Sequence, residues 1–251
     1  MTDDQLLEVL DGAARAVGRR LAALEDWRPA TDRPGQYRID VVADLAALEV
    51  LLDAGLGVLS EESGLHHPRR DLVAVLDPVD GSTNASRGIP WFATSVCVLD
   101  DAGPRAALVL NQASGERFEA VRGGGARLDG EPVAPSGCAD LADALVGLSG
   151  LPSHHWGWQQ FRAMGSASLD LCSVACGRLD GYVDASPGAH GPWDYLGALL
   201  VCTEAGASVV EAAGQDLVTL DPRARRSPVA AATPALAERL ARARGEQSST
   251  P

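Results

Sequence analysis

Apolar side chains recur at helical spacing in several parts of the chain. Within residues 4–24, Leu6 and Leu10 begin a series on one face of a helix with 3.6 residues per turn, so this stretch is predicted to be helical. The same spacing predicts four further helices, at residues 44–54, 167–177, 194–204 and 234–244. Asp44 and Asp194 each stand at the start of one of them, where a carboxylate serves as an N-cap.

Short apolar runs bounded by turn residues predict strands between these helices. Residues 92–100 and 105–112 are joined by the turn signal DAGP and are expected to pair. Further strands are expected within residues 57–63, 71–77, 115–133, 144–150, 179–185, 207–212 and 228–233. Helices mixed with strands in this way indicate an α+β or α/β fold in which helices pack on sheets. The polar tail, residues 245–251, is expected to be disordered.

The length and composition bound the architecture. With 251 residues, 46% of them hydrophobic, the chain can bury one large core or two smaller ones. The composition shifts around residues 134–144, which predicts an N-terminal half at 1–138 and a C-terminal half at 139–251. No apolar run approaches the roughly 20 residues of a membrane span, and the acidic start does not resemble a signal peptide. We therefore expect a cytoplasmic protein with no membrane partner.

The charge and the reactive residues narrow the chemistry. A net charge of −13 disfavours a nucleic-acid polymer as partner, although a metal ion could still attract a small phosphorylated substrate. All 21 basic residues are arginine, which excludes a Schiff-base lysine and a P-loop lysine. The five cysteines form no CxxC pair, which argues against a disulfide framework or a structural zinc site.

Carboxylates stand at the ends of predicted elements in three places: Glu61 in SEES, Asp77 with Asp80 in DPVDGSTN, and Asp194 in PWDYLG. Such hard oxygen ligands suit Mg²⁺, Mn²⁺ or Ca²⁺. Each place also has an ordinary structural interpretation: a solvated loop for SEES, an Asx turn for the aspartate pair, and an N-cap for Asp194. The octamer is harder to explain in that way, because two acids, a proline, a glycine and two hydroxyls coincide.

Within the octamer, Pro78 holds the turn and leaves the Val79 carbonyl oxygen available as a further ligand. Gly81 permits close approach of the backbone. If residues 81–83 open a helix, their amides would hold a phosphate group.

These segments together resemble the inositol monophosphatase family, whose members are Mg²⁺-dependent, lithium-sensitive phosphomonoesterases. DPVDGSTN is similar to the family's metal-binding signature, SEES to its glutamate segment, and PWDYLGALLVCTEAGASV to its third acidic segment, all in the family's order. The resemblance extends over about residues 40–210. It implies a layered α-β-α-β-α sandwich of the inositol monophosphatase and fructose-1,6-bisphosphatase type, commonly assembled as a homodimer.

The resemblance also implies roles for individual residues. The implied ligands of two or three Mg²⁺ ions, with Mn²⁺ as an alternative, are Glu61, Asp77, Val79 through its carbonyl, Asp80 and Asp194. The implied substrate-binding residues are Gly81, Ser82, Thr83, Asp184 and Asp194. For catalysis, Glu61 and Ser82 would orient the attacking water, and Asp44 would support Ser82 from behind.

The chain departs from the family pattern in two loops. The loop TDRPGQYRIDVVAD contains no lysine, so Arg33 is the nearest substitute, and the spacer from Asp44 to Glu61 is short. These differences concern the binding of a third metal ion. The loop after Asp184 is longer than usual, and its His190 either faces the substrate or is a surface histidine.

The resulting hypothesis is an enzyme that hydrolyses a small phosphate monoester, with inositol monophosphate or a similar polyol or sugar phosphate as substrate. Histidinol phosphate, fructose 1,6-bisphosphate and a nucleotide 3′-phosphate are alternatives for the same chemistry. A second hypothesis, from a different class, is a phosphate-binding or regulatory relative that has no catalytic activity.

Overall fold

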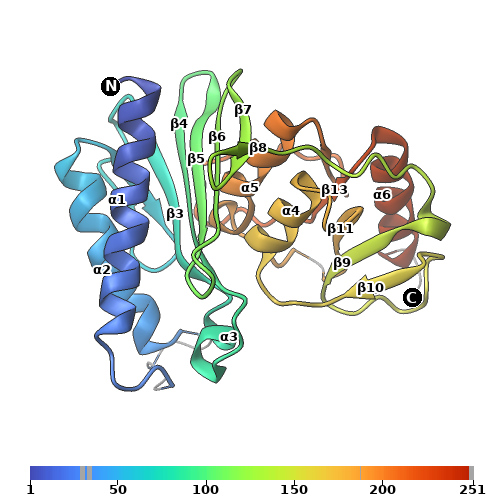
Figure 1. Cartoon of the computed structure of the whole chain (residues 1–251), viewed down its shortest axis with the longest axis horizontal. Helices are drawn as coiled ribbons and strands as arrows, with labels where there is room; N and C mark the ends of the chain where they lie inside the picture. Colours follow the sequence, from blue (N-terminus) through green and yellow to red (C-terminus); the bar gives the residue numbers. More distant parts are fainter. Residues whose placement is uncertain (29–31, 33–35, 187, 249–251) are drawn as a thin grey trace.

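The structure is a computed structural model, and it describes residues 1–28, 32, 36–186 and 188–248. The elements form two β-sheets with a layer of helices between them and further helices on both outer faces (Figure 1). From one side to the other the layers are α1 and α2, the first sheet, α4 and α5, the second sheet, and α6. The predicted α-β-α-β-α sandwich is therefore confirmed.

The first sheet has the strand order β2-β1-β3-β4-β5-β6-β7-β8. Strands β1 and β3 are parallel, and the other neighbours are antiparallel. The helices and strands of this part of the chain are, in order, α1 Asp3–Ala22, α2 Arg38–Asp53, β1 Gly57–Ser60, β2 Gly64–His66, β3 Val73–Asp80, α3 Ser82–Arg87, β4 Ala93–Asp100, β5 Gly103–Asn111, β6 Arg117–Val121, β7 Gly125–Leu128 and β8 Glu131–Pro132. Strand β3 is buried along its whole length, as expected of a central strand covered on both faces.

The second sheet has the order β10-β9-β11-β13-β12. Strand β9 runs parallel to β10 and β11, whereas β13 is antiparallel to β11 and β12. The elements of this half are the 3₁₀ turn η1 Leu141–Asp143, β9 Leu145–Ser149, β10 Gln160–Arg162, α4 Ala167–Ala175, β11 Gly181–Asp184, α5 Pro192–Ala205, β12 Ser208–Glu211, β13 Pro228–Ala231 and α6 Pro234–Ser248.

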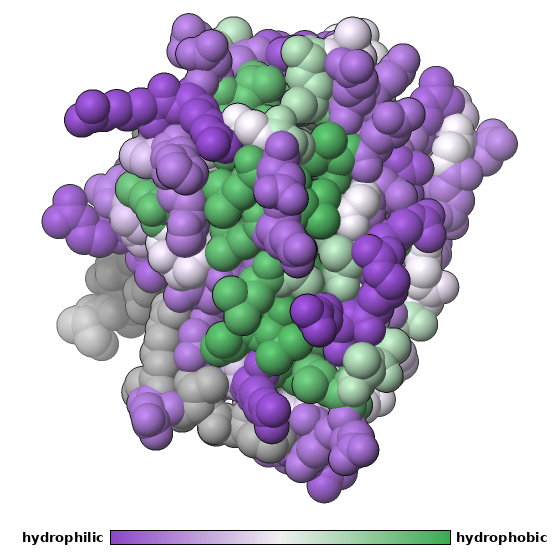
Figure 2. Space-filling view, turned by 90° about the vertical axis from the view of Figure 1, so that its left-hand side faces the viewer, coloured by the Kyte–Doolittle hydropathy of each residue, from purple (hydrophilic) through white to green (hydrophobic). Residues whose placement is uncertain are grey.

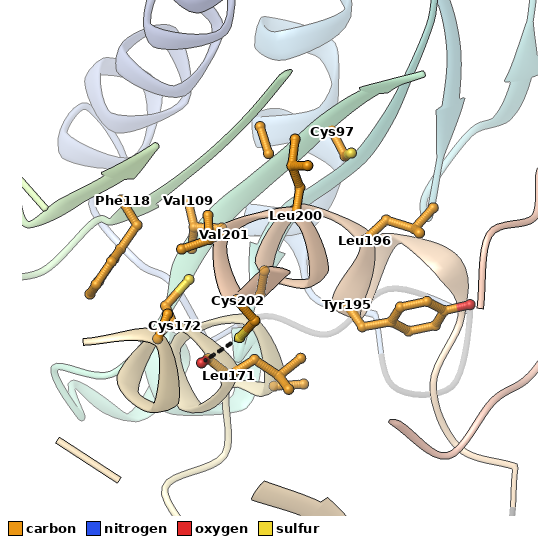
Figure 3. Packing of buried hydrophobic residues seen from close by; sticks show 14 of the residues in the cluster. Cys97, Val109, Phe118, Leu171, Cys172, Tyr195, Leu196, Leu200, Val201 and Cys202 are labelled. Carbon is orange, nitrogen blue, oxygen red and sulfur yellow. Dashed lines mark hydrogen bonds between the residues drawn. The ribbon is translucent and has the colours of Figure 1, made fainter. Parts of the chain in front are cut away.

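The helix layer between the sheets comes from the second half of the chain and packs against both sheets. Phe118 on β6 and Leu196 on α5 belong to one buried cluster with residues of α4, and Figure 3 shows side chains of α5 between Val109 of the first sheet and Leu171 and Cys172 of α4. Cys202 Sγ on α5 also donates a hydrogen bond to the Leu171 carbonyl oxygen on α4 (3.1 Å). The change from one sheet to the other falls between β8 and β9. The two halves share this core. The division of the chain at 138/139 stays a prediction.

Three predicted element ends are wrong. Helix α2 begins at Arg38, not at residue 44, so Asp44 lies inside the helix and is no N-cap. Asp194 is not the N-cap of α5 either, because Gly191 has that position and the Asp194 side chain accepts a hydrogen bond from its amide (2.6 Å). Helix α6 continues to Ser248, beyond the predicted residue 244. Residues 249–251 of the predicted disordered tail lie outside the described residues.

One outer face of the molecule carries exposed apolar side chains. Figure 2 shows them gathered on the side formed by α1 and α2, where the side chain of Leu45 is 63% exposed and that of Val41 38%. No helix in the described part of the chain is long and apolar enough to cross a membrane. The cytoplasmic location stays a prediction.

The shared core predicts cooperative unfolding. Leu196 is fully buried in the helix layer, so Leu196→Ala should lower the free energy of unfolding by about 2–5 kcal/mol. Leu45→Ala, at an exposed position of α2, should change it by less than about 0.5 kcal/mol. Urea unfolding followed by far-ultraviolet circular dichroism and by tryptophan fluorescence should give one transition that moves as a whole in the Leu196 variant. Two separate transitions, only one of them shifted, would contradict the shared core.

Candidate active site

A bulge at the end of β3 directs two aspartates to the same side of the first sheet. Asp77 pairs with Ser95 on β4, and Asp80 pairs with Ala93, so β3 has one extra residue between the two pairs. In a regular strand, side chains three positions apart point to opposite faces. The extra residue turns Asp80 back to the face of Asp77. Both side chains are buried there, beside the helix layer.

Three carboxylates from separate elements converge at this point. Glu61, Asp77 and Asp194 each offer an oxygen, and these oxygens lie within 4.8 Å of one another. Glu61 follows β1 and Asp77 lies near the end of β3; since these strands are parallel neighbours, their carboxyl ends meet at the same edge of the sheet. Asp194 comes from the first turn of α5. The structure thus brings together the three acidic segments that the sequence singled out.

The electrostatics of this cluster fit a bound cation. Burial, followed by the negative charge of Asp194, raises the pKa of Glu61 to about 9. Burial and the neighbouring Glu61 raise the pKa of Asp77 well above its usual value. Ionised carboxylates at such short distances need positive charge among them. Three hard oxygen donors are the ligand type of Mg²⁺ or Mn²⁺, so the residues present fit the metal that the family resemblance implies.

Asp80 lies beside this cluster and caps α4. Its Oδ2 accepts hydrogen bonds from Ser166 Oγ (2.6 Å), Ser168 Oγ (2.5 Å) and the Ser168 amide (2.7 Å). Burial and the charge of Asp194 raise the pKa of Asp80, against the lowering effect of these donors. Asp80 therefore joins the first half of the chain to the helix layer. Its predicted role as a metal ligand stays a prediction, as does that of the Val79 carbonyl.

The segment after Asp80 forms the expected helix start. Gly81 has φ of 89° and precedes α3, so the residues predicted to hold phosphate do open a helix. A Cβ at this position would lie 3.0 Å from the Trp91 carbonyl oxygen and 3.1 Å from that of Gly165. Only glycine meets both requirements. Ser82 is half-buried and Thr83 exposed, which leaves both accessible to a ligand.

A residue near the phosphate-binding segment had no sequence signal. Tyr37 precedes α2, and its hydroxyl lies 3.4 Å from Thr83 Oγ1. Hydrogen bonds from Thr83 and Ser86 lower the pKa of Tyr37. The predicted substitute for the loop lysine, Arg33, lies outside the described residues.

Helix α2 supplies two buried aspartates, of which the sequence pattern indicated one. Asp44 Oδ1 accepts a hydrogen bond from Ser60 Oγ (2.5 Å), and Ser60 Oγ in turn accepts one from the Glu62 amide (3.1 Å). Asp44 thus holds the turn that carries Glu61, and its predicted support of Ser82 stays a prediction. Asp40, one turn earlier, contributes to the raised pKa of both Glu61 and Asp77. The sequence signal that could have pointed to Asp40 is its spacing of four residues from Asp44, which puts both on one face of a helix.

Asp184 and His190 form a second cluster of polar side chains, next to Asp194. Asp184, predicted to bind substrate, is fully buried, and its Oδ2 has no hydrogen-bond partner among the described residues. His190 is 12% exposed; its Nε2 lies 3.8 Å from Asp184 Oδ1 and its Nδ1 lies 3.7 Å from Asp194 Oδ2. Burial alone would lower the pKa of His190, but its contact with Asp194 and the charges of both carboxylates raise it to about 9. The interpretation of His190 as a surface histidine is therefore wrong.

With the layered fold and the converging carboxylates described, comparison with known proteins identifies the family. A model of the inositol monophosphatase family matches residues 38–249. The chain belongs to this family.

Individual relatives agree with this assignment. The chain is 31% identical over 243 residues to the inositol-1-monophosphatase of Mesorhizobium japonicum. This alignment covers 87% of this chain and 90% of the relative. It is 31% identical over 233 residues to the Nus factor SuhB of Escherichia coli K12, covering 83% and 86% of the two chains. A solved structure from Pyrococcus horikoshii, described as similar to inositol-1 monophosphatase, superposes with a TM-score of 0.86 at 24% identity over 96% of this chain and 99% of that one. At that identity, the structural likeness shows the fold.

The raised pKa values predict how the stability of the metal-free protein depends on pH. The pKa of Glu61 is about 9 in the folded state against 4.5 ordinarily, so the folded state binds more protons than the unfolded state between these values. Stability must then fall as pH rises. The pKa of His190 is also raised, to about 9. Its contribution to stability therefore also falls as pH rises, and it is lost through about pH 9. The melting temperature in EDTA should be lower at about pH 8.5 than at about pH 6, and Mg²⁺ should reduce the difference. A melting temperature that rises over this range would contradict the assignment.

The two aspartates of the octamer should respond differently to the same substitution. Asp77→Asn removes a repelled carboxylate and keeps an oxygen that can accept from the Val79 amide (2.9 Å), so the metal-free protein should be as stable as the wild type or more stable. Asp80→Asn replaces one carboxylate oxygen by an NH₂ group, which faces either the donors to Oδ2 or the Ala167 amide that donates to Oδ1 (3.3 Å). It should lower the free energy of unfolding by about 1–3 kcal/mol. Urea unfolding in EDTA measures both, and equal losses in the two variants would refute the distinction.

Proposed function

We propose that this protein is a Mg²⁺-dependent phosphatase that hydrolyses a small phosphate monoester, with inositol monophosphate or a similar polyol or sugar phosphate as substrate. The observation that supports this most is the convergence of Glu61, Asp77 and Asp194 beside the helix start at Gly81. The carboxylates would hold two or three Mg²⁺ ions, or Mn²⁺, and the helix start would hold the phosphate group. The membership of the inositol monophosphatase family points to the same chemistry.

The roles of the chain's own residues follow from their positions. Bound Mg²⁺ supplies the positive charge that neutralises a phosphate dianion and makes a water molecule more acidic. The backbone amides after Gly81, with the Ser82 and Thr83 hydroxyls, bind and orient the phosphate oxygens. Glu61 lies at the cluster, and its amide donates to the Leu76 carbonyl oxygen (3.1 Å). Its carboxylate would orient the attacking water together with Ser82. Because water is the nucleophile, no covalent intermediate with the protein is required.

The alcohol part of the substrate is less closely defined than its phosphate group. Histidinol phosphate, fructose 1,6-bisphosphate and a nucleotide 3′-phosphate would meet the same phosphate-binding residues, since they differ in the leaving alcohol. We expect the alcohol to face the loop between β11 and α5, which contains His190. A homodimer, expected from the family resemblance, is likewise a proposal, and light scattering in solution measures it.

The relative from Escherichia coli named Nus factor SuhB motivates the second candidate, a regulatory or phosphate-binding protein without turnover. The complete set of carboxylates at the site favours the enzyme, because a protein that only binds phosphate has no need of three converging acids whose charges repel one another.

A panel of phosphate esters tests the proposal. Phosphate release should be measured from inositol 1-phosphate, histidinol phosphate, fructose 1,6-bisphosphate and a nucleoside 3′-phosphate, with Mg²⁺ and then with excess EDTA. We expect turnover of at least one ester, its loss in EDTA, and a turnover rate lowered roughly 100-fold or more in Asp77→Asn. Glu204→Gln, whose carboxylate binds the Gly123 and Gly125 amides away from the site, is the matched control. Absence of Mg²⁺-dependent release from every ester would favour the non-catalytic candidate.

A further inference from the structure

His190 is held in place on both sides by groups of the second half. Its Nε2 lies 3.1 Å from the hydroxyl oxygen of Tyr182, a side chain that is fully buried. Its backbone carbonyl accepts a hydrogen bond from the Arg226 amide (2.9 Å), which forms an isolated antiparallel bridge. The ring position is therefore fixed by β11 and by the segment before β13, and the remaining nitrogen, Nδ1, is directed to Asp194 (3.7 Å to Oδ2).

This contact fixes one side of the Asp194 carboxylate. Oδ2 accepts the Gly191 amide (2.6 Å) and lies next to His190 Nδ1. A carboxylate oxygen held in this way sets the rotation of the carboxylate, and the rotation decides whether Asp194 can share a cation with Glu61 and Asp77. Partners of this kind, one step away from a metal, control affinity through the ligand they hold.

Asp184 lies on the far side of the same ring. It is fully buried, and its Oδ2 has no hydrogen-bond partner in the described part of the chain. A buried carboxylate in this situation is costly unless a positive or polar group faces it, and His190 Nε2 lies 3.8 Å from its other oxygen. A substrate hydroxyl cannot reach a side chain with no exposed surface, so Asp184 is placed to act on His190 and not on the substrate.

We propose that His190 is a positioning residue for the metal ligand Asp194, and that Asp184 and Tyr182 act through His190 by holding its ring. The Asp184–His190–Asp194 series connects the end of β11 to the start of α5 across the lengthened loop. This inference rests on the metal site of the proposed function. It replaces the substrate contact expected of Asp184 with a role in metal affinity.

Direct metal binding tests the inference without using turnover. Mn²⁺ binding to the metal-free protein should be followed by the electron paramagnetic resonance signal of free Mn²⁺. His190→Ala should raise the dissociation constant by roughly 10-fold or more, and His190→Gln, which keeps a donor near Asp194, should have an intermediate value. His154→Ala, at an exposed histidine, is the matched control and should bind as the wild type does. Thermal unfolding in EDTA must show that each variant is folded.

Asp184→Asn distinguishes the two roles of that carboxylate. If it acts through His190, the variant weakens Mn²⁺ binding, leaves KM for the ester nearly unchanged at saturating metal, and adds little to His190→Ala in the double variant. An Asp184→Asn protein with normal Mn²⁺ binding and a raised KM would overturn the inference and restore the substrate contact.

The inference and the proposed function can fail separately. Weakened Mn²⁺ binding in the His190 variants, with no phosphate release by the wild type from any ester, would support the positioning role and refute the enzyme. Normal Mn²⁺ binding in His190→Ala, with an active wild type, would refute the positioning role alone. A wild type that binds no Mn²⁺ would refute both.

Discussion

The structure depends on one unfavourable arrangement, the crowding of buried carboxylates at the carboxyl end of β3. Glu61, Asp77 and Asp194 lie within a few ångströms of one another, and burial raises the pKa of Glu61 and Asp77. Protons or a cation must offset the repulsion. The parallel pairing of β1 with β3, the bulge in β3 and the capped start of α5 are the local features that hold the acids together against it.

The helix layer makes this arrangement part of the core. Asp194 belongs to α5, and Asp80 accepts its hydrogen bonds from the start of α4. Asn84 adds a further connection, because its Nδ2 donates to the Met164 carbonyl oxygen (2.7 Å) ahead of α4. The contacts that join the two halves therefore also set the positions of the acids. Since α4 and α5 pack into one cluster with the first sheet, a change in this layer reaches the site even where no site residue is touched.

The sequence predicted most strands and the three acidic segments, because each leaves a local pattern of apolar spacing or of acids after an apolar run. The order of the layers was implied by the family resemblance. The local patterns failed where the outcome depends on contacts between elements. The pattern predicts Asp44 as an N-cap, whereas the helix begins earlier and both Asp40 and Asp44 are buried inside it. No local pattern indicates that the ring of His190 lies next to both Asp184 and Asp194, and the substrate contact that the resemblance implies for Asp184 stays a prediction. Neither the start of α2 nor the path of the loop after β11 is encoded by a local pattern.

This difference explains why the chemistry is easier to identify than the substrate. The acids of the metal site lie at the ends of regular elements, so strand pairing and helix packing fix them and the motifs around them are recognisable. In the proposed function the leaving alcohol would face a loop, and the length and contacts of loops vary more than those of the sheets they connect. In this chain the loop brings His190 inward onto Tyr182 and Asp194. If Asp194 holds a metal ion as proposed, this loop residue supports the metal site, and side chains closer to the surface would recognise the alcohol.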